Sequence, residues 1–153
     1  MSRNFTVDSN YLIYFTQSWS PHHQTTIEDF ERRLKRGDKV HIIPHTLIEA
    51  FSVLSRLPSP FRQSAADAHN LLRANFGSFP MTEQPRPQET WTFLAHLAAV
   101  GIGGGRTYDF WIALSAHRAG IKELVTWNAK HFPPNGFPGL RIVEPSALPK
   151  NTN

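Results

Sequence analysis

The chain has 153 residues, of which 40% are apolar and 12% aromatic, enough for one domain with a buried core and too many for a disordered chain. The absence of cysteine excludes disulfides, thiolate nucleophiles and cysteine-ligated metal centres, and it favours a reducing compartment such as the cytoplasm. A formal charge of +4 is compatible with a polyanionic partner, and no apolar run approaches the roughly 18 residues of a membrane-spanning helix.

The first half of the chain is predicted to alternate strands with helices. Asp8 and Ser9 follow a short apolar run and belong to the residue types that cap helices, so a strand is expected to turn directly into a helix there. Prolines at 58 and 60 are expected to end a later helix. In chain order the predicted elements are a strand at 4–7, a helix from residue 11, a helix at 22–35, a strand at 40–43 and a helix at 46–57.

The second half continues the alternation. The predicted elements are a helix at 61–76, a loop at 77–87, a helix at 88–100, a glycine-rich joint at 101–105, a helix at 107–118 and strands at 124–126 and 140–143. The helix at 88–100 is expected to bury a stripe formed by Trp91, Leu94, Leu97 and Ala98. Strands separated by helices predict an α/β fold, with a mostly parallel sheet covered on both faces, in one domain over 1–153.

Three carboxylates interrupt apolar surroundings: Asp8, Glu49 and Asp109. Each has a structural explanation when it is taken alone. Asp8 could cap the helix that follows it, and Thr46 with Glu49 fits the spacing of a capping box. Asp109 would suit the positive end of a helix dipole. For each of the three acids considered alone, the sequence therefore does not distinguish a structural role from a catalytic or metal-binding one.

Taken together, the three carboxylates predict a metal site. Asp8 lies at the end of a predicted strand, and the other two lie in the first turns of predicted helices, which is where sites form in open parallel sheets. Carboxylates that meet there would repel one another unless a cation neutralises them. An all-oxygen cluster selects Mg²⁺ or Mn²⁺, and such a site suits hydrolysis of phosphodiester bonds.

These segments resemble the acidic motifs of PIN-domain ribonucleases, in the order in which that family carries them. The last segment is similar to the close of the toxin subgroup called VapC. The matching segments are Val7-Asp8-Ser9-Asn10, Thr46-Leu47-Ile48-Glu49, Tyr108-Asp109-Phe110-Trp111-Ile112, Leu124-Val125-Thr126 and Gly139-Leu140-Arg141-Ile142-Val143.

The resemblance implies a three-layer α/β/α sandwich and Mg²⁺- or Mn²⁺-dependent cleavage of RNA. It also implies a homodimer inhibited by a small antitoxin protein. Carried over by position, Asp8, Glu49 and Asp109 would be the catalytic, metal-binding acids. Ser9 would be a nearby hydroxyl that hydrogen-bonds these acids.

One position departs from the family pattern. Where the family usually has a further Asp after the third strand, this chain has Asn128. An amide can offer its carbonyl oxygen to a metal but contributes no negative charge, so a second metal would bind more weakly. Asn128 could equally be a turn residue after a strand.

Three basic residues near these motifs are candidates for RNA contacts: Arg106, Lys130 and His131. Each could also be an ordinary surface residue. The histidines do not show a zinc-binding spacing, since Pro44 and a predicted strand end separate His41 from His45.

Two alternative functions share some of these sequence features. The first alternative is an RNA-binding or scaffold protein that keeps the fold with little catalysis, which the amide at position 128 would favour. The second is a haloacid-dehalogenase-like phosphatase. That chemistry needs a second Asp two residues after the first, and Asn10 stands there instead.

Overall fold

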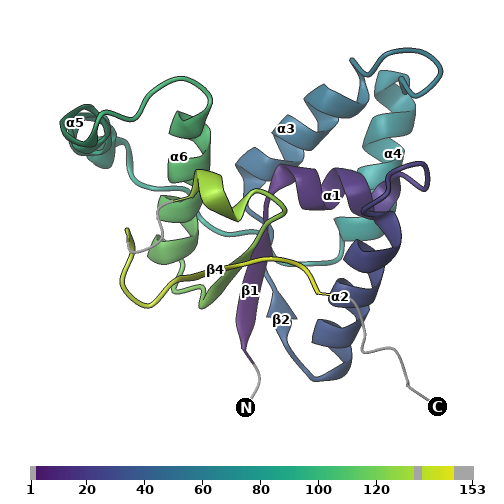
Figure 1. Cartoon of the computed structure of the whole chain (residues 1–153), viewed down its shortest axis with the longest axis horizontal. Helices are drawn as coiled ribbons and strands as arrows, with labels where there is room; N and C mark the ends of the chain where they lie inside the picture. Colours follow the sequence, from purple (N-terminus) through teal and green to yellow (C-terminus); the bar gives the residue numbers. More distant parts are fainter. Residues whose placement is uncertain (1–2, 133–135, 147–153) are drawn as a thin grey trace.

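The computed structural model describes residues 3–132 and 136–146, so the domain expected over 1–153 extends beyond the described residues at both ends. Four parallel strands form one sheet in the order β2-β1-β3-β4 (Figure 1). Phe5 pairs with Val40 on one side and with Glu123 on the other, and Glu123 pairs with Arg141. The strands are β1 (Asn4–Val7), β2 (Lys39–Val40), β3 (Glu123–Val125) and β4 (Arg141–Val143).

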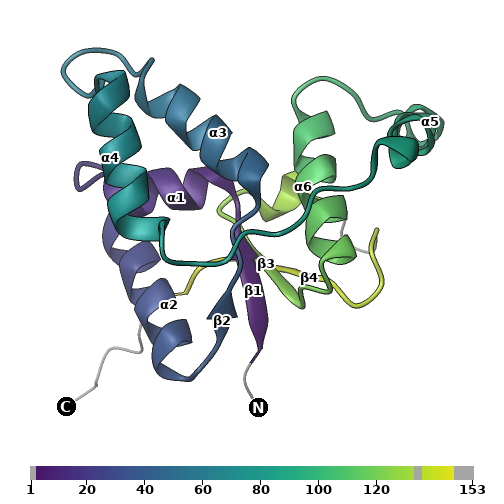
Figure 2. The same cartoon turned by 180° about the vertical axis from the view of Figure 1, so that it is seen from behind.

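Helices cover both faces of this sheet. The helices are α1 (Ser9–Thr16), α2 (His23–Lys35), α3 (Pro44–Leu54), α4 (Ala65–Phe76), α5 (Thr90–Val100) and α6 (Arg106–Arg118), with short 3₁₀ turns η1 (Pro87–Glu89) and η2 (Ala129–His131). Helices α1 to α4 gather on one side of the sheet, α6 lies on the other, and α5 projects outward beyond α6 (Figures 1 and 2). The predicted three-layer α/β/α sandwich with a parallel sheet is confirmed.

The core follows the alternation of side chains along the strands. Val125 packs with Phe5 and Val7 into a cluster that α1, α2, α3 and α4 complete. Its neighbour Leu124 points to the opposite face, where Ile112 and Ala116 of α6 cover it. Because successive residues of a strand face opposite ways, the two neighbouring apolar residues Leu124 and Val125 let β3 contribute to both layers.

Some predicted boundaries were wrong. The second strand is limited to Lys39–Val40, because Ile42 pairs with the loop before η1 instead of with the sheet. The N–H of Ile42 donates to Pro80 O, and its carbonyl oxygen accepts the N–H of Thr82. Helix α3 begins at Pro44 and ends at Leu54, two residues earlier at the start than predicted and three earlier at the end. Helix α4 begins at Ala65 rather than at residue 61, because the side chain of Ser64 caps it.

The buried face predicted for the helix at 88–100 is confirmed at Leu97 and wrong at Trp91, Leu94 and Ala98. Phe93 and Leu97 of α5 are the buried residues, and they pack against Phe110 of α6. Trp91 is 81% exposed and Leu94 40% exposed, so much of the apolar surface of α5 faces away from the sandwich. The reason is that α5 packs beside α6, outside the sheet layers, and its apolar residues run all round the helix. Among the described residues, no helix is long and apolar enough to cross a membrane.

Candidate active site

Asp8 is the residue at which β1 passes into α1. Its backbone is extended, and its N–H donates to Val125 O, which continues the ladder between β1 and β3. Its Oδ1 accepts the N–H of Tyr11 at 3.0 Å, so the predicted capping role is confirmed. Its Oδ2 accepts the hydroxyl of Thr126, which directly follows β3, at 2.5 Å. The same carboxylate therefore caps a helix and lies at the carboxyl end of the sheet.

The pKa of Asp8 is raised to about 6, mainly because the side chain is buried, with 4% of the residue exposed. The hydrogen bonds from Thr126 and Tyr11 lower the pKa, while the charges of Asp109 and Glu49 raise it further. Both donors to Asp8 are uncharged. The structure thus brings the three predicted carboxylates into one electrostatic neighbourhood.

Glu49 lies in the second turn of α3, and the capping box suggested for it does not form. Helix α3 starts two residues before Thr46, whose hydroxyl donates to Ile43 O at 2.7 Å instead of capping a helix. The carboxylate of Glu49 accepts the hydroxyl of Ser9 at 2.9 Å, and His45 Nε2 lies 3.4 Å from its other oxygen. The interactions with His45 and Ser9 lower the pKa of Glu49. As predicted, Ser9 is hydrogen-bonded to one of the acids.

Asp109 occupies the first turn of α6 and is half-buried. Burial raises its pKa, the charge of Glu49 adds to that effect, and His131 and Arg106 oppose it. Arg106 Nε donates to the backbone oxygen of His131 at 3.4 Å, which ties the start of α6 to η2. Two of the three predicted basic residues, Arg106 and His131, therefore border the carboxylates. Lys130 is exposed on η2, next to His131 in the chain.

Asn128 follows β3 and makes a turn. Its N–H donates to the hydroxyl of Thr126 at 3.0 Å, and its backbone oxygen accepts the N–H of His131 at 2.9 Å. Within the described residues its side-chain amide makes no hydrogen bond. The backbone thus performs the turn role, and the amide has no competing partner.

Two residues of this neighbourhood were missed by sequence reasoning. The signal for Thr126 was its position: it is a hydroxyl residue at the end of a predicted strand, as Asp8 is an acid at the end of another, and the ends of parallel strands meet at one edge of a sheet. His45 was placed between a predicted strand and a helix expected to begin at residue 46, but it lies on α3 one turn before Glu49. Its ring stacks on Tyr108 at 5.4 Å between centroids. The early start of α3 hid this i, i+4 relationship.

The donor set has the chemistry of a site for a hard cation. Asp8, Glu49 and Asp109 supply only oxygen, which Mg²⁺ and Mn²⁺ prefer. Burial raises the pKa of both Asp8 and Asp109, and the neighbouring carboxylates add to that effect, so a divalent cation would stabilise the charged forms of both groups. In residues 3–132 and 136–146, no three His, Asp or Glu side chains are already arranged as a metal-binding group. The three carboxylates would therefore have to draw closer around an ion.

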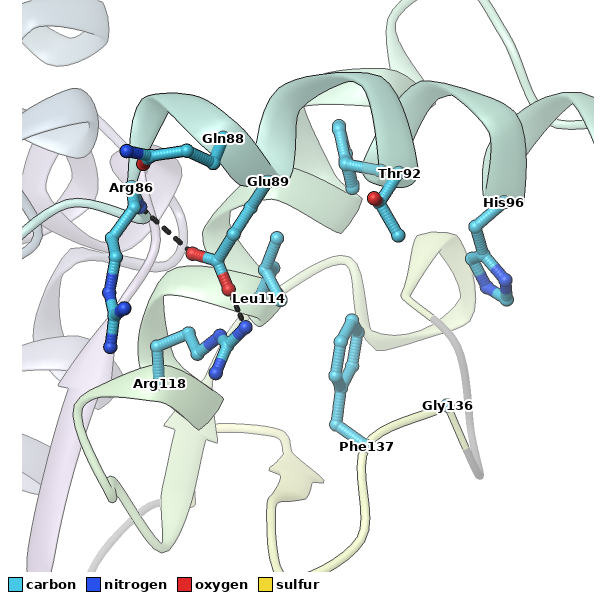
Figure 3. A pocket seen from close by; sticks show the side chains of 10 residues that line it. Arg86, Gln88, Glu89, Thr92, His96, Leu114, Arg118, Gly136 and Phe137 are labelled. Carbon is cyan, nitrogen blue, oxygen red and sulfur yellow. Dashed lines mark hydrogen bonds and ion pairs between the residues drawn. The ribbon is translucent and has the colours of Figure 1, made fainter.

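A cavity of about 710 Å³ lies apart from these carboxylates, between α5, the second half of α6 and residues 136–137 (Figure 3). Its one carboxylate, Glu89, accepts the backbone N–H of Arg86 at 2.8 Å and pairs with Arg118. Arg118 neutralises this single carboxylate, and among the described residues no second acid lines the cavity beside it, so the lining has no cluster of oxygen ligands for a cation. The cavity is therefore a weaker candidate for chemistry than the carboxylate neighbourhood.

Comparison with known proteins adds independent information. The PIN domain family matches residues 5–132. Ribonuclease VapC40 from two strains of Mycobacterium tuberculosis is 32% identical over 117 residues, which cover 76% of this chain and 81% of that protein. Ribonuclease VapC27 from the same species is 40% identical over 88 residues, or 56% of this chain and 60% of that protein.

Solved structures show the same fold at low sequence identity. VapBC2 from Rickettsia felis, bound to a DNA fragment from its promoter, superposes with a TM-score of 0.65 at 17% identity, covering 92% of this chain and 98% of that chain. Mycobacterium tuberculosis VapC20, a toxin that cleaves the sarcin-ricin loop, gives 0.64 at 14% identity, covering 90% and 98%.

Proposed function

The chain belongs to the PIN-domain family, and we propose that it is a metal-dependent endoribonuclease, the toxin of a toxin–antitoxin pair. One observation carries the proposal beyond family membership: Asp8, Glu49 and Asp109 come from three separate elements and interact electrostatically at one place. Such a cluster is unfavourable by itself and becomes favourable when a divalent cation neutralises it.

In the proposed reaction, Asp8, Glu49 and Asp109 hold Mg²⁺ or Mn²⁺, and Asn128 adds a weak carbonyl ligand. When bound, the ion activates water and stabilises the charge that builds on the phosphorus centre. Ser9 fixes the rotamer of Glu49 through its 2.9 Å hydrogen bond. Thr126 fixes that of Asp8 and favours its ionised form.

The substrate contacts follow from the charges beside the carboxylates. Arg106, Lys130 and His131 lie at the start of α6 and on η2, where they can pair with the phosphates on either side of the bond that is cut. The positive charges of Arg106 and Lys130 also offset the repulsion between RNA and the three acids.

Two protein partners are proposed. The first is a small antitoxin, as in the VapBC2 complex that this fold resembles. The second is another copy of the chain. The outward side of α5 supports a homodimer, because Trp91 is 81% exposed, Leu94 40% and Val100 52%, an unusual amount of apolar surface for one helix.

A second candidate function is an RNA-binding PIN protein with little or no catalysis. The amide of Asn128 in place of an acid favours it, and so does the absence, among the described residues, of a ready metal-binding group. Direct metal titration separates the two candidates, since a pure RNA-binding protein would not bind Mn²⁺ stoichiometrically.

The deciding experiment measures RNA cleavage by purified protein with Mn²⁺, with Mg²⁺ and with EDTA. We expect cleavage that needs a metal and that is lost in Asp8→Asn and Asp109→Asn. Asp67→Asn is the matched control, because Asp67 is an exposed acid in the first turn of another helix. Activity that survives in both site variants would refute the proposal. Stoichiometric RNA binding without cleavage or Mn²⁺ binding would establish the second candidate.

A further inference from the structure

Each of the four parallel strands has a basic residue at its start. Arg3 and Lys122 directly precede β1 and β3, and Lys39 and Arg141 are the first residues of β2 and β4. Parallel strands begin at the same edge of a sheet, and neighbours lie about 4.8 Å apart, so the strand order places the four residues in a row. These four residues and Arg36, at the end of α2, form what we call the basic edge.

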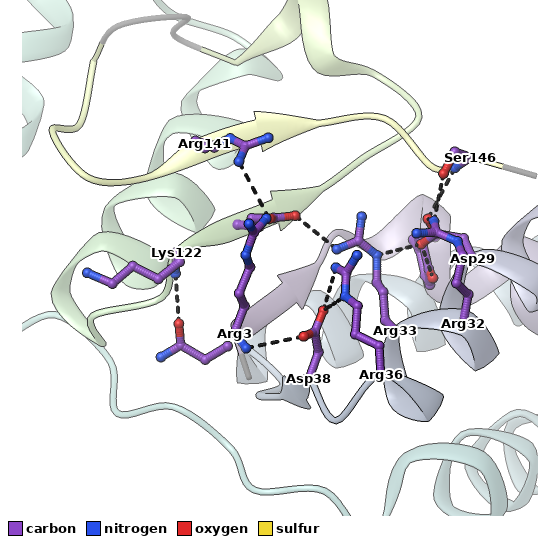
Figure 4. A network of polar contacts seen from close by, with 12 residues as sticks. Arg3, Asp29, Arg32, Arg33, Arg36, Asp38, Lys122, Arg141 and Ser146 are labelled. Atoms are coloured by element: carbon purple, nitrogen blue, oxygen red, sulfur yellow. Dashed lines mark hydrogen bonds and ion pairs between the residues drawn. The ribbon is translucent and has the colours of Figure 1, made fainter. Parts of the chain in front are cut away.

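A buried carboxylate organises the centre of the basic edge. Glu123 Oε1 accepts a hydrogen bond from Arg3 Nη1 at 3.0 Å and lies 3.9 Å from Arg141 Nη1. Its Oε2 accepts from Arg33, which is itself buried, at 2.9 Å (Figure 4). Although burial raises the pKa of Glu123, the hydrogen bonds from Arg33 and Arg3 outweigh that effect and keep the group ionised.

A second buried carboxylate holds the α2 end of the row. Asp38 Oδ2 accepts from Arg36 Nε at 2.8 Å, and Oδ1 accepts the backbone N–H of Arg3 at 3.1 Å. The side chains of Asp38 and Glu123 are 1% and 5% exposed, whereas those of Arg3, Arg36 and Arg141 are 54%, 42% and 66% exposed. The acids thus lie beneath the surface, and the guanidinium groups they orient face the solvent.

The charges at this edge do not balance. Arg33 also pairs with Asp29, which in turn pairs with Arg32. The basic edge with Arg32 and Arg33 therefore contributes seven cations, and Asp29, Asp38 and Glu123 contribute three anions, which leaves four positive charges. The formal net charge of the whole chain is also +4. The net charge of this network therefore equals the net charge of the whole chain. Such a concentration of positive charge on one surface is typical of proteins that bind a polyanion.

We propose that the basic edge binds the phosphate backbone of a folded RNA, at the end of the sheet opposite the carboxylate neighbourhood. The inference rests on the proposed function, because the RNA is its substrate. Strands of up to four residues make the sheet only about 13 Å long between its two ends, and a folded RNA that contacts both would pass around the side of the domain. The guanidinium groups suit phosphate oxygens, and none of the four strand starts carries the apolar side chain expected at the centre of a protein interface.

The test compares wild type with the double variant Lys122→Gln/Arg141→Gln, which removes two exposed charges and leaves the hydrogen bonds of Arg3, Arg33 and Arg36 in place. The probe is a fluorescently labelled RNA stem-loop, and its anisotropy is measured in EDTA over a range of salt concentrations. Arg62→Gln/Arg73→Gln is the matched control, since both residues are exposed on the α3–α4 side. Circular dichroism and thermal unfolding verify the fold of each variant.

We expect the Lys122/Arg141 variant to bind roughly 5- to 30-fold more weakly at about 0.15 M salt, with a logarithmic salt slope shallower by about 1.4 to 1.8. The Arg62/Arg73 control should keep both values. Equal affinity and slope in wild type and the Lys122/Arg141 variant would overturn the inference. Loss of antitoxin binding instead of RNA binding would overturn it too, and would assign the edge to a protein partner.

Cleavage is measured separately with Mn²⁺ on the same RNA, so the two proposals can fail independently. A wild type that cleaves while the Lys122/Arg141 variant binds normally leaves the nuclease standing and refutes the basic edge. A wild type that binds through the basic edge without cleaving supports this inference and refutes the nuclease.

Discussion

The hydroxyl of Thr126 donates to Oδ2 of Asp8 at 2.5 Å, across the 118 residues that separate them in the chain. This bond joins the ends of the two central strands, β1 and β3. It also works against the burial that raises the pKa of Asp8. Thr126 therefore keeps an acid ionisable in a place where its charge is costly.

Replacing Thr126 by Val should raise the pKa of Asp8 above its value of about 6, because the buried carboxylate loses a donor that favours its charged form. A hydrogen bond to a charged group is worth about 1.5–3 kcal/mol, so the midpoint should move up by about one to two pH units. The measurement is the pH dependence of Mn²⁺ affinity. Thr126→Ser keeps the donor and should keep the wild-type midpoint; a Val variant with that same midpoint would contradict the role given to the hydroxyl.

Replacing Asp8 by Asn should stabilise the metal-free protein at neutral pH. The folded-state pKa of about 6 lies above the ordinary value of 3.8, so the folded state binds the proton more tightly than the unfolded chain. The stabilisation from that proton is complete below about pH 4 and is lost as the pH rises through about 6. Asn avoids the loss and retains an oxygen that can cap α1.

Urea unfolding of both proteins in EDTA checks this prediction. We expect the advantage of Asp8→Asn to grow by on the order of 3 kcal/mol between pH 4 and pH 7.5. Asp67→Asn, at an exposed position, should show no such growth. An advantage that is constant across this range would mean that Asp8 is not strained by its buried charge.

Replacing Asn128 by Asp should strengthen Mn²⁺ binding. A negative charge near the three carboxylates attracts the cation by several kcal/mol at close range, so calorimetry should show a gain of at least about tenfold. Asn128→Ala leaves the backbone hydrogen bonds of the turn intact and should weaken binding slightly. Identical affinities in all three proteins would assign Asn128 to the turn alone.

Replacing Trp91 by Glu should weaken the proposed homodimer. An exposed tryptophan at the centre of an interface commonly contributes about 2 kcal/mol, equivalent to a dissociation constant about 30-fold higher. Sedimentation equilibrium measures the constant directly. Trp19→Glu, at a residue 44% exposed beside Phe61, is the control and should leave it unchanged. A wild type that stays monomeric at high concentration would rule out the dimer.

The alternation of strands and helices, the parallel sheet and the three acids that interrupt apolar runs could all be predicted from the amino-acid sequence. These features follow from local causes: caps, prolines and the spacing of apolar residues act over a few positions. The capping role of Asp8 belongs to this group, because its partner, Tyr11, lies three residues away.

The groups that surround each acid depend on contacts between distant parts of the chain, and the sequence did not predict them. The hydroxyl of Ser9 bonds to Glu49, 40 residues away in the chain, and that of Thr126 bonds to Asp8, 118 residues away. Local sequence patterns span only a few residues and cannot predict such contacts. The packing of α5 also differs from what its apolar sequence predicts, because Trp91 lies outside the core. The row of basic residues at the strand starts arises in the same way, because strand order in a sheet is set by long-range pairing and not by neighbours in the sequence.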